Sequence, residues 1–255
     1  MICNLLKKII VISTCFGILF SFSSTKASCN KTWYIKRNGN QSPTPPPDAA
    51  MLKQYNACYI NDSLSDGEKK LYLTFDAGYE NGNIEKILDI LYEEKIVAAF
   101  FILDNLVIKN TDLVKRMSEE GHLVCNHTKN HKNLSFATKD EISDDLTELE
   151  NICREKAGVE MDKFFRFPEG KYSEEALKYV NELGYKTVFW SFAYADWDNH
   201  KQPSKEFAVK KILDNTHNGA IILLHPTSKT NAEILPNLIS EWRSMGYEFG
   251  SLKEI

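Results

Sequence analysis

The residues of this sequence best suited to acid–base and metal chemistry are a few carboxylates, imidazoles and one arginine, each close to the end of a short apolar run. His127 and His131 have the i, i+4 spacing that places two imidazoles on one side of a helical turn, where they can share a divalent cation. That spacing alone also suits two surface histidines. Because other polar residues stand in equivalent positions along the chain, we expect His127 and His131 to be metal ligands.

Asp76 follows the apolar run Leu71–Phe75, where an unpaired carboxylate would be costly to desolvate. Arg166 could supply the counter-charge and keep Asp76 ionised and oriented as a base. A purely structural ion pair between the two residues is the alternative.

His225 directly follows a run of four aliphatic residues. Asp196 offers a carboxylate that would fix the tautomer of His225 and raise the pKa of its imidazole, as a general acid requires.

Several other residues are candidates for contacts with a substrate. Trp190 and Trp197 could form an apolar wall for a substrate methyl group, although packing in the core is an equal alternative. Tyr79, Asn81 and Gly82 continue the loop after Asp76, where a glycine-containing turn lets backbone N–H groups approach a substrate oxyanion. We therefore expect Tyr79 and Asn81 to contribute to substrate binding.

Short runs rich in Val, Ile, Phe and Tyr alternate with amphipathic stretches, a pattern typical of successive β-α units with parallel strands. The predicted strands are 71–75, 98–103, 123–126, 164–167, 186–190, 220–224 and 247–251. The predicted helices are 84–95, 111–120, 139–156, 174–183, 204–216 and 231–245. The sequence therefore predicts an α/β fold, a distorted (β/α) barrel with about seven parallel strands. In such barrels the carboxyl ends of the strands carry the active site, which is where the polar residues fall.

The N-terminal part differs in composition from the rest of the chain. Residues 1–27 combine lysines, an apolar run and a small-residue boundary, which predicts an export signal, with an uncleaved membrane anchor as the alternative. Residues 28–67 form an arm with a proline-rich segment that cannot join a helix or a central strand. Its Trp33–Tyr34 pair is expected to pack on the domain formed by residues 68–255. The catalytic part is thus predicted to lie outside the cytoplasm.

Composition excludes some classes of function. The formal net charge is −4, which gives no basic field for a nucleic acid. Outside residues 1–27 there is no C-x-x-C pair among the cysteines, so a zinc site made of cysteines is not expected. These cysteines are Cys29, Cys58, Cys125 and Cys153. A Cys29–Cys58 disulfide and unpaired buried thiols remain alternatives. We expect a monomer whose only membrane contact is the N-terminal segment, if that segment is uncleaved.

Together the polar segments resemble the five ordered motifs of the NodB homology domain, the polysaccharide deacetylases of carbohydrate esterase family four. The five segments are Thr74–Gly78, His127–Thr128 with His131, Arg166–Gly170, Asp196–Trp197 and Leu223–His225. The resemblance covers roughly residue 70 to the C-terminus. Residues 74–82, the proline-bearing arm and residues 225–233 are similar to the delta-lactam-biosynthetic (PdaA-type) branch of this family.

The resemblance implies a role for each matched residue. Asp76 matches the catalytic base, Arg166 its partner, Asp196 the orienting carboxylate and His225 the acid. The matched metal ligands are His127 and His131, for zinc or another divalent transition metal. The departure is Ala77, because most of the family has an aspartate there as the third metal ligand. Glu169 also stands where a larger aromatic or basic residue is common.

The branch resemblance implies hydrolysis of the acetyl group of N-acetylmuramic acid in spore-cortex peptidoglycan, on the way to the muramic delta-lactam. The glycan strand would then be the protein's partner. One alternative keeps the chemistry and changes the substrate to N-acetylglucosamine, chitooligosaccharide or acetylxylan. Another is a glycan-binding pseudoenzyme that lost its metal together with the aspartate replaced by Ala77.

Overall fold

The computed structural model describes residues 30–255. Its strands are β1 (Lys31–Thr32), β2 (Lys36–Asn38), β3 (Gln41–Thr44), β4 (Ala57–Cys58), β5 (Lys70–Ala77), β6 (Ala99–Ile102), β7 (Leu123–Asn126), β8 (Asp162–Phe165), β9 (Lys171–Tyr172), β10 (Lys186–Val188), β11 (Ala220–Leu224) and β12 (Glu248–Phe249). Its helices are α1 (Ile84–Glu94), α2 (Asp104–Lys109), α3 (Thr111–Glu119), α4 (Lys139–Ala157), α5 (Glu174–Glu182), α6 (Lys205–Leu213) and α7 (Lys229–Ser244), with 3₁₀ turns η1 (Ala49–Tyr55), η2 (Pro168–Gly170) and η3 (Leu252–Glu254).

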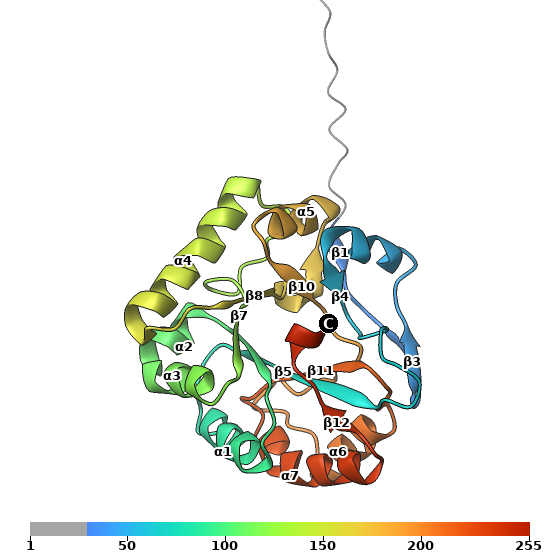
Figure 1. The fold of residues 1–255 in the computed structure, drawn as a ribbon. Helices are drawn as coiled ribbons and strands as arrows, with labels where there is room; N and C mark the ends of the chain where they lie inside the picture. The colour runs from blue at the N-terminus through green and yellow to red at the C-terminus, as the bar shows by residue number, and fades with distance from the viewer. Residues whose placement is uncertain (1–29) are drawn as a thin grey trace, which may run out of the picture.

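The main sheet runs in the order β11-β5-β6-β7-β8-β10-β4, with β12 also beside β5, and all of its strand pairings are parallel. Beyond β10, the Ser191 N–H donates to the Ile221 carbonyl at 3.0 Å, which brings the two ends of the sheet together. Helices surround the ring of strands (Figure 1). The predicted distorted (β/α) barrel is confirmed.

The alternation of side chains along β5 explains how the barrel positions its chemistry. Leu71, Leu73 and Phe75 belong to the apolar layer between sheet and helices, whereas Tyr72 belongs to the layer inside the barrel. Successive side chains of a strand point to opposite faces, so Asp76 shares the inner face with Tyr72. The strand therefore delivers a carboxylate to the interior at its carboxyl end.

The helices cover the outer face of the sheet in the predicted way. In α1, Ile84, Ile87, Leu88 and Leu91 are buried along one stripe, as helical periodicity requires. Helix α4 begins with a capping box in which Thr138 and Glu141 satisfy each other's backbone N–H groups. The six predicted helices are all present, with ends shifted by a few residues.

Two local differences from the sequence prediction have physical reasons. Helix α2 was not predicted, because its six residues directly follow an apolar strand and are too few to show a helical repeat. Strand β8 ends at Phe165 rather than Phe167, since its register with β7 shifts near Asn126 and a 3₁₀ turn begins at Pro168.

The N-terminal arm covers the flank of the barrel between α5 and α6 (Figure 1). Trp33 is buried there, stacks on Phe189 with ring centroids 4.8 Å apart and donates from Nε1 to the Trp190 carbonyl at 2.9 Å, while Tyr34 is exposed. The proline-rich segment, residues 42–47, begins in β3 of the peripheral β2–β3 hairpin and continues beyond it. The arm also supplies β4 to the main sheet, next to β10, so it is part of the barrel wall.

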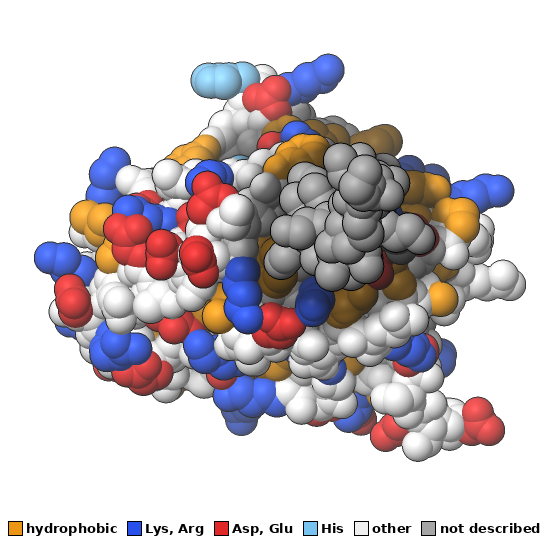
Figure 2. Space-filling model, turned by 90° about the horizontal axis from the view of Figure 1, so that it is seen from above, with side chains coloured by type: hydrophobic (Ala, Val, Ile, Leu, Met, Phe, Trp, Pro, Cys, Tyr) orange, Lys and Arg blue, Asp and Glu red, His pale blue; other side chains and the backbone are white. Residues whose placement is uncertain are grey.

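Charged side chains of both signs are interspersed on the face shown in Figure 2. One ion pair, Lys139–Glu182, joins α4 and α5. Cys125 and Cys153 are buried thiols. Within residues 30–255, no helix combines the length and apolarity needed to cross a membrane. The predicted export signal or anchor, and the Cys29 half of the alternative disulfide, lie outside the described residues.

Candidate active site

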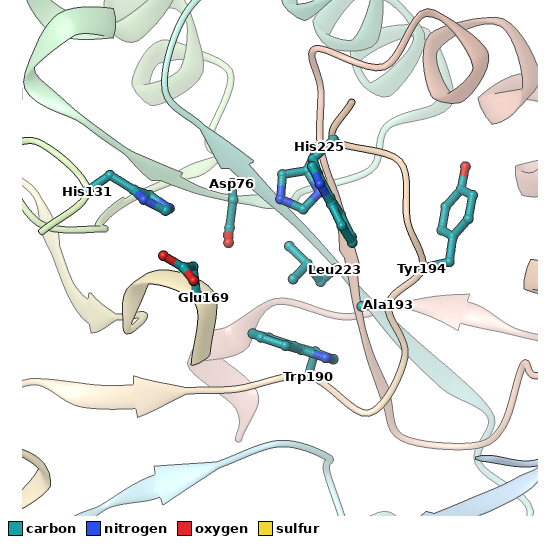
Figure 3. A pocket seen from close by; sticks show the side chains of 9 residues that line it. Asp76, His131, Glu169, Trp190, Ala193, Tyr194, Leu223 and His225 are labelled. Carbon is teal, nitrogen blue, oxygen red and sulfur yellow. The ribbon is translucent and has the colours of Figure 1, made fainter. Parts of the chain in front are cut away.

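The predicted polar residues meet at the rim formed by the carboxyl ends of the strands. Asp76 lies in the middle of the cleft, with His131 on one side and His225 on the other (Figure 3). Glu169 faces them from the opposite wall, and Trp190 closes the base of the same cleft (Figure 3). Segments far apart in the sequence therefore form one site.

Asp76 is held by a guanidinium that has no contact with solvent. Arg166 donates from Nη1 to Asp76 Oδ1 at 2.7 Å, and the exposed side-chain fractions of Arg166 and Asp76 are 0% and 10%. Its other donors bind Thr74 Oγ1 at 3.0 Å and the Val188 carbonyl at 2.9 Å. Arg166 is thus fixed from three directions. Because it engages Oδ1, the second carboxylate oxygen, Oδ2, remains available for chemistry in the cleft.

The charge state of Asp76 follows from this arrangement. Burial alone would raise the pKa of this carboxyl group. The positive charge of Arg166, with smaller contributions from His127 and His225, outweighs burial and lowers the pKa of Asp76 below its ordinary value of 3.8. Asp76 is therefore an ionised acceptor at neutral pH.

His225 is supported by a chain of buried polar groups. Its Nδ1 donates to Asp196 Oδ1 at 2.7 Å, and its backbone N–H donates to Asp196 Oδ2 at 2.8 Å. The same Oδ2 accepts from Asn231 Nδ2 at 2.6 Å, and the Tyr194 hydroxyl donates to Asn231 Oδ1. With Nδ1 occupied, His225 presents Nε2 as the ring atom that can exchange a proton with a ligand.

The same contacts set the acidity of His225. Burial lowers the pKa of the imidazole, but the carboxylates of Asp196 and Asp76 outweigh burial and the repulsion from Arg166. The pKa of His225 is raised above its ordinary value of 6.5. A raised pKa keeps the ring protonated to higher pH, which suits proton donation to a leaving group.

His127 and His131 lie on a loop after β7, so the predicted helical turn is wrong. Thr128 and His131 both have left-handed backbone conformations, with φ of 70° and 61°. Asn126 Oδ1 holds the loop by accepting from the Thr128 N–H at 2.9 Å. The loop nevertheless brings the two imidazoles together, with ring centroids 5.0 Å apart. Strain of this kind is frequent where side chains are held for function.

His127 has the protonation state of a metal ligand. Its Nδ1 donates to the Arg166 carbonyl at 2.9 Å, and burial lowers the pKa of His127 to about 4, so the ring is neutral at pH 7. The lone pair of Nε2 then faces Asp76 Oδ2 at 3.5 Å. Two facing acceptors are stabilised by a cation or by a water that donates to one of them. His127 and its neighbour His131 therefore fit a divalent cation.

The donor set is nevertheless small. Ala77 is completely buried in the apolar layer and has no donor atom. Across residues 30–255, no cluster of three or more histidine, cysteine or acidic side chains has the geometry of a metal site. A cation bound by His127 and His131 would have few protein ligands, so its affinity should be low.

Two depressions form the cleft around these residues. One has a volume of about 530 Å³ and is walled by Trp190, Tyr194 and Leu223, and the other, of about 240 Å³, is walled by Tyr79 and His127. Four residues line both depressions: Asp76, His131, Trp197 and His225.

Of the predicted substrate contacts, Tyr79, Trp190 and Trp197 thus lie in the cleft, and Asn81 lines neither depression. The Asn81 side chain instead donates to the Thr227 carbonyl at 2.8 Å. The Gly82 N–H, expected near the oxyanion, donates to the Glu80 carboxylate.

Asn231 was not predicted to belong to the site, and Glu169 was expected only as a departure from the family pattern that could alter glycan contacts. Glu169 has a φ of 55°, pairs with Lys171 at 2.7 Å and turns its carboxylate into the cleft (Figure 3). Asn231 stands where the buried stripe of α7 formed by Leu235, Leu238 and Trp242 would place an apolar residue. A polar residue in that stripe was the available signal.

Comparisons with known proteins show which family the chain resembles. The sequence profile of the polysaccharide deacetylase family matches residues 64–188. The peptidoglycan-N-acetylmuramic acid deacetylase PdaA of Bacillus subtilis is 38% identical over 228 residues, which cover 88% of this chain and 84% of the relative. A peptidoglycan-N-acetylglucosamine deacetylase of Bacillus cereus is 30% identical over 202 residues, covering 77% and 92% of the two chains.

The fold comparison gives the same relationship. The solved structure of Bacillus subtilis PdaA, a family 4 carbohydrate esterase, superposes with a TM-score of 0.83 at 37% identity, covering 88% of this chain and 96% of that one. Deacetylases of this family are generally metal-dependent. The family resemblance expected from the motifs is confirmed. The chain belongs to the polysaccharide deacetylases of carbohydrate esterase family 4, which are hydrolases that act on amide bonds.

Proposed function

We propose that this protein removes the acetyl group from N-acetylmuramic acid residues of peptidoglycan. The observation that carries the proposal is that the free Oδ2 of Asp76 and the imidazole of His225, held by Asp196, lie beside each other in one cleft (Figure 3). This arrangement suits a base and an acid acting on one amide bond. The identity of the sugar is supported by the 38% identity to the muramic acid deacetylase.

The first half of the reaction uses Asp76 and the wall around it. Arg166 holds Oδ1 at 2.7 Å, so Oδ2 accepts a proton from a water as the water's oxygen attacks the acetyl carbonyl carbon. Because the pKa of Asp76 is lowered, the carboxylate is a weak base and the reaction needs further polarisation of the carbonyl. A divalent cation bound by His127 and His131 would supply that polarisation as a Lewis acid.

The second half uses His225. Its Nε2 donates a proton to the sugar nitrogen as the C–N bond breaks, which releases acetate and a free amine. Asp196, at 2.7 Å from Nδ1, stabilises the imidazolium before this transfer and holds the ring in position. Trp190 and Trp197 provide apolar surface in the cleft beside the reacting group.

The setting of the reaction is part of the same proposal. The leader predicted in residues 1–27 would place the protein outside the cytoplasm, at the cell wall or between the forespore membranes. There it would act as a monomer on the glycan strand. The amine that it frees on muramic acid can then join the lactyl carboxyl of the same sugar to form the delta-lactam of spore cortex.

Mass spectrometry of treated peptidoglycan tests the choice of sugar. Peptidoglycan with and without stem peptides is incubated with the protein and digested to disaccharides. We expect new amines, and lactam where cyclisation follows, on muramic acid residues. Deacetylation confined to N-acetylglucosamine would favour that alternative substrate, and glycan binding without any deacetylation would favour the pseudoenzyme.

Calorimetric titration with Zn²⁺ tests the proposed metal ligands. Replacing His131 by glutamine should weaken Zn²⁺ binding at least about tenfold, because it removes one of only two protein ligands. His131 is exposed, so the change should leave the fold intact. The matched control is His200→Gln, which changes an exposed histidine on another loop. Equal affinities of wild type and His131→Gln would contradict the assignment.

Replacing Asn231 by leucine should lower kcat about tenfold and move the basic limb of the pH–rate profile to lower pH. Leucine has a similar branched shape but forms no hydrogen bonds, so Asp196 Oδ2 loses one donor while keeping the His225 N–H, and the Tyr194 hydroxyl loses its acceptor. These losses loosen the group that orients His225. Stopped assays across a pH series measure both effects, with Asn151→Leu on α4 as control. A change in thermal stability with an unaltered pH profile would show that Asn231 is only structural.

A further inference from the structure

The N-terminal arm is bound to the walls of the active-site cleft through Trp33. The indole N–H of Trp33 donates to the Trp190 carbonyl at 2.9 Å, and its backbone N–H donates to the Gly170 carbonyl at 2.7 Å. Gly170 directly follows Glu169, and both Glu169 and Trp190 line the cleft (Figure 3). One buried residue of the arm therefore joins two wall segments that are distant in sequence.

The turn that aims Glu169 into the cleft is packed directly against Trp33. Glu169 and Gly170 have left-handed backbone conformations, with φ of 55° and 65°. A Cβ atom added at Gly170 would lie 2.9 Å from the Trp190 ring and 3.0 Å from the Cβ of Trp33. A left-handed conformation at a residue such as Glu169 persists only when the surrounding structure holds it. Trp33 is part of that surrounding structure.

A second residue of the arm, Arg37, contacts the wall segment formed by residues 190–194. Its Nη2 donates to the carbonyl of Ala193, which lines the same depression as Trp190. Its guanidinium also lies over the Phe192 ring, 5.6 Å from the centroid. Trp33 and Arg37 thus hold this segment at two points, through donors on their side chains.

These contacts lie outside the part of the chain that carries the family pattern. The family profile matches residues 64–188, and Trp33 and Arg37 precede that range. The hydrogen bonds described above for the Asp76 carboxylate and the His225 ring come from Arg166 and Asp196, and not from the arm. The arm therefore acts on the walls of the cleft and leaves the reacting groups to the barrel.

We propose that the N-terminal arm is a positioning element of the active site, in which Trp33 and Arg37 hold the walls that contact the substrate. This inference rests on the proposed function and adds the arm to it. Walls that contact the substrate equally in the ground state and in the transition state change KM and not kcat. Loss of the arm contacts should therefore raise KM, with kcat and both limbs of the pH–rate profile unchanged.

Replacing Trp33 by phenylalanine should raise KM for glycan strands about tenfold and keep kcat within about twofold of the wild type. Phenylalanine can still stack on Phe189 but has no N–H for the Trp190 carbonyl. The matched control is Trp242→Phe on α7, which removes a buried indole N–H that donates to Thr216 Oγ1 at 2.8 Å and lines neither depression of the cleft. The control should lose thermal stability and keep the wild-type KM.

Replacing Arg37 by methionine tests the arm at an exposed position, where the fold should tolerate the change. Methionine keeps the apolar stem but cannot donate to the Ala193 carbonyl, so KM should rise about threefold. The matched control is Lys36→Met, which alters the exposed neighbour on β2 whose side chain points to the other face of the strand. It should keep the wild-type KM.

Hydrogen exchange without substrate separates this inference from the proposed function. In Trp33→Phe, the amides of residues 169–172 and 191–194 should exchange at least about tenfold faster than in the wild type, and in Trp242→Phe they should not. Unaltered exchange in Trp33→Phe, or a wild-type KM in both arm variants, would overturn the positioning role. If the wild type releases no acetate, the proposed function fails, and the exchange rates still decide whether the arm holds the walls.

Discussion

Replacing Asp76 by asparagine should lower kcat for acetate release by about a thousandfold. Asparagine can still accept the hydrogen bond from Arg166, which is 2.7 Å from Asp76 Oδ1, so the geometry of the cleft should persist. It cannot take a proton from water. The loss therefore measures the removal of the base, and initial rates of acetate release at neutral pH are the direct readout.

The Asp76→Asn experiment needs a check on folding, because the substitution removes the carboxylate that pairs with Arg166. A buried guanidinium without its counter-charge destabilises a protein by about 3–5 kcal/mol. Thermal unfolding should therefore be measured in parallel. Asp112→Asn, whose side chain is 99% exposed on α3, is the matched control and should retain wild-type turnover. Turnover of folded Asp76→Asn within a few fold of the wild type would exclude Asp76 as the base.

Replacing Asp196 by asparagine should lower kcat about a hundredfold at neutral pH and move the basic limb of the pH–rate profile to lower pH. Activity needs Asp76 ionised and His225 protonated. It should rise as pH increases through the lowered pKa of Asp76, below 3.8, and fall through the raised pKa of His225, above 6.5. The carboxylate of Asp196 is the main cause that raises the pKa of His225, so its loss lowers that pKa.

Two features of the profile make this result diagnostic. The acidic limb should stay in place, because Asp196 is absent from the groups that shift the pKa of Asp76. Asp214→Asn, which alters a carboxylate on the surface beside Lys210, should reproduce the wild-type profile. A uniform loss of rate at every pH, with the basic limb unmoved, would mean that Asp196 supports the fold rather than the acid.

Much of the fold and of the site could be predicted because both follow from local patterns. Alternating side chains in a strand separate the inner from the outer face, so the placement of Asp76 at a strand end already directs it into the barrel. The same reasoning applies to His225 after β11. In a parallel barrel these ends share one rim, and residues 149 positions apart in sequence can therefore be expected to meet.

The remaining features depend on tertiary contacts. The His127–His131 loop uses left-handed backbone at Thr128 and His131, which only the Asn126 side chain and the surrounding structure stabilise. The spacing alone suggested a helix. Strand β4 has two residues, too few to show the alternating pattern of a strand, so its pairing with β10 could not be predicted from the sequence. Asn231 acts through its hydrogen bond to Asp196. The buried apolar stripe of α7 showed that Asn231 faces the interior, but not that Asp196 lies opposite it.

The proposed deacetylation is tested most directly by measuring acetate, new amine and lactam together when the purified wild-type protein acts on glycan strands lacking stem peptides. We expect the amount of acetate to equal the amount of new amine plus lactam, all of it on muramic acid. Tight binding of the strands with no release of acetate, at any pH between the pKa values of Asp76 and His225 and with Zn²⁺ supplied, would contradict it.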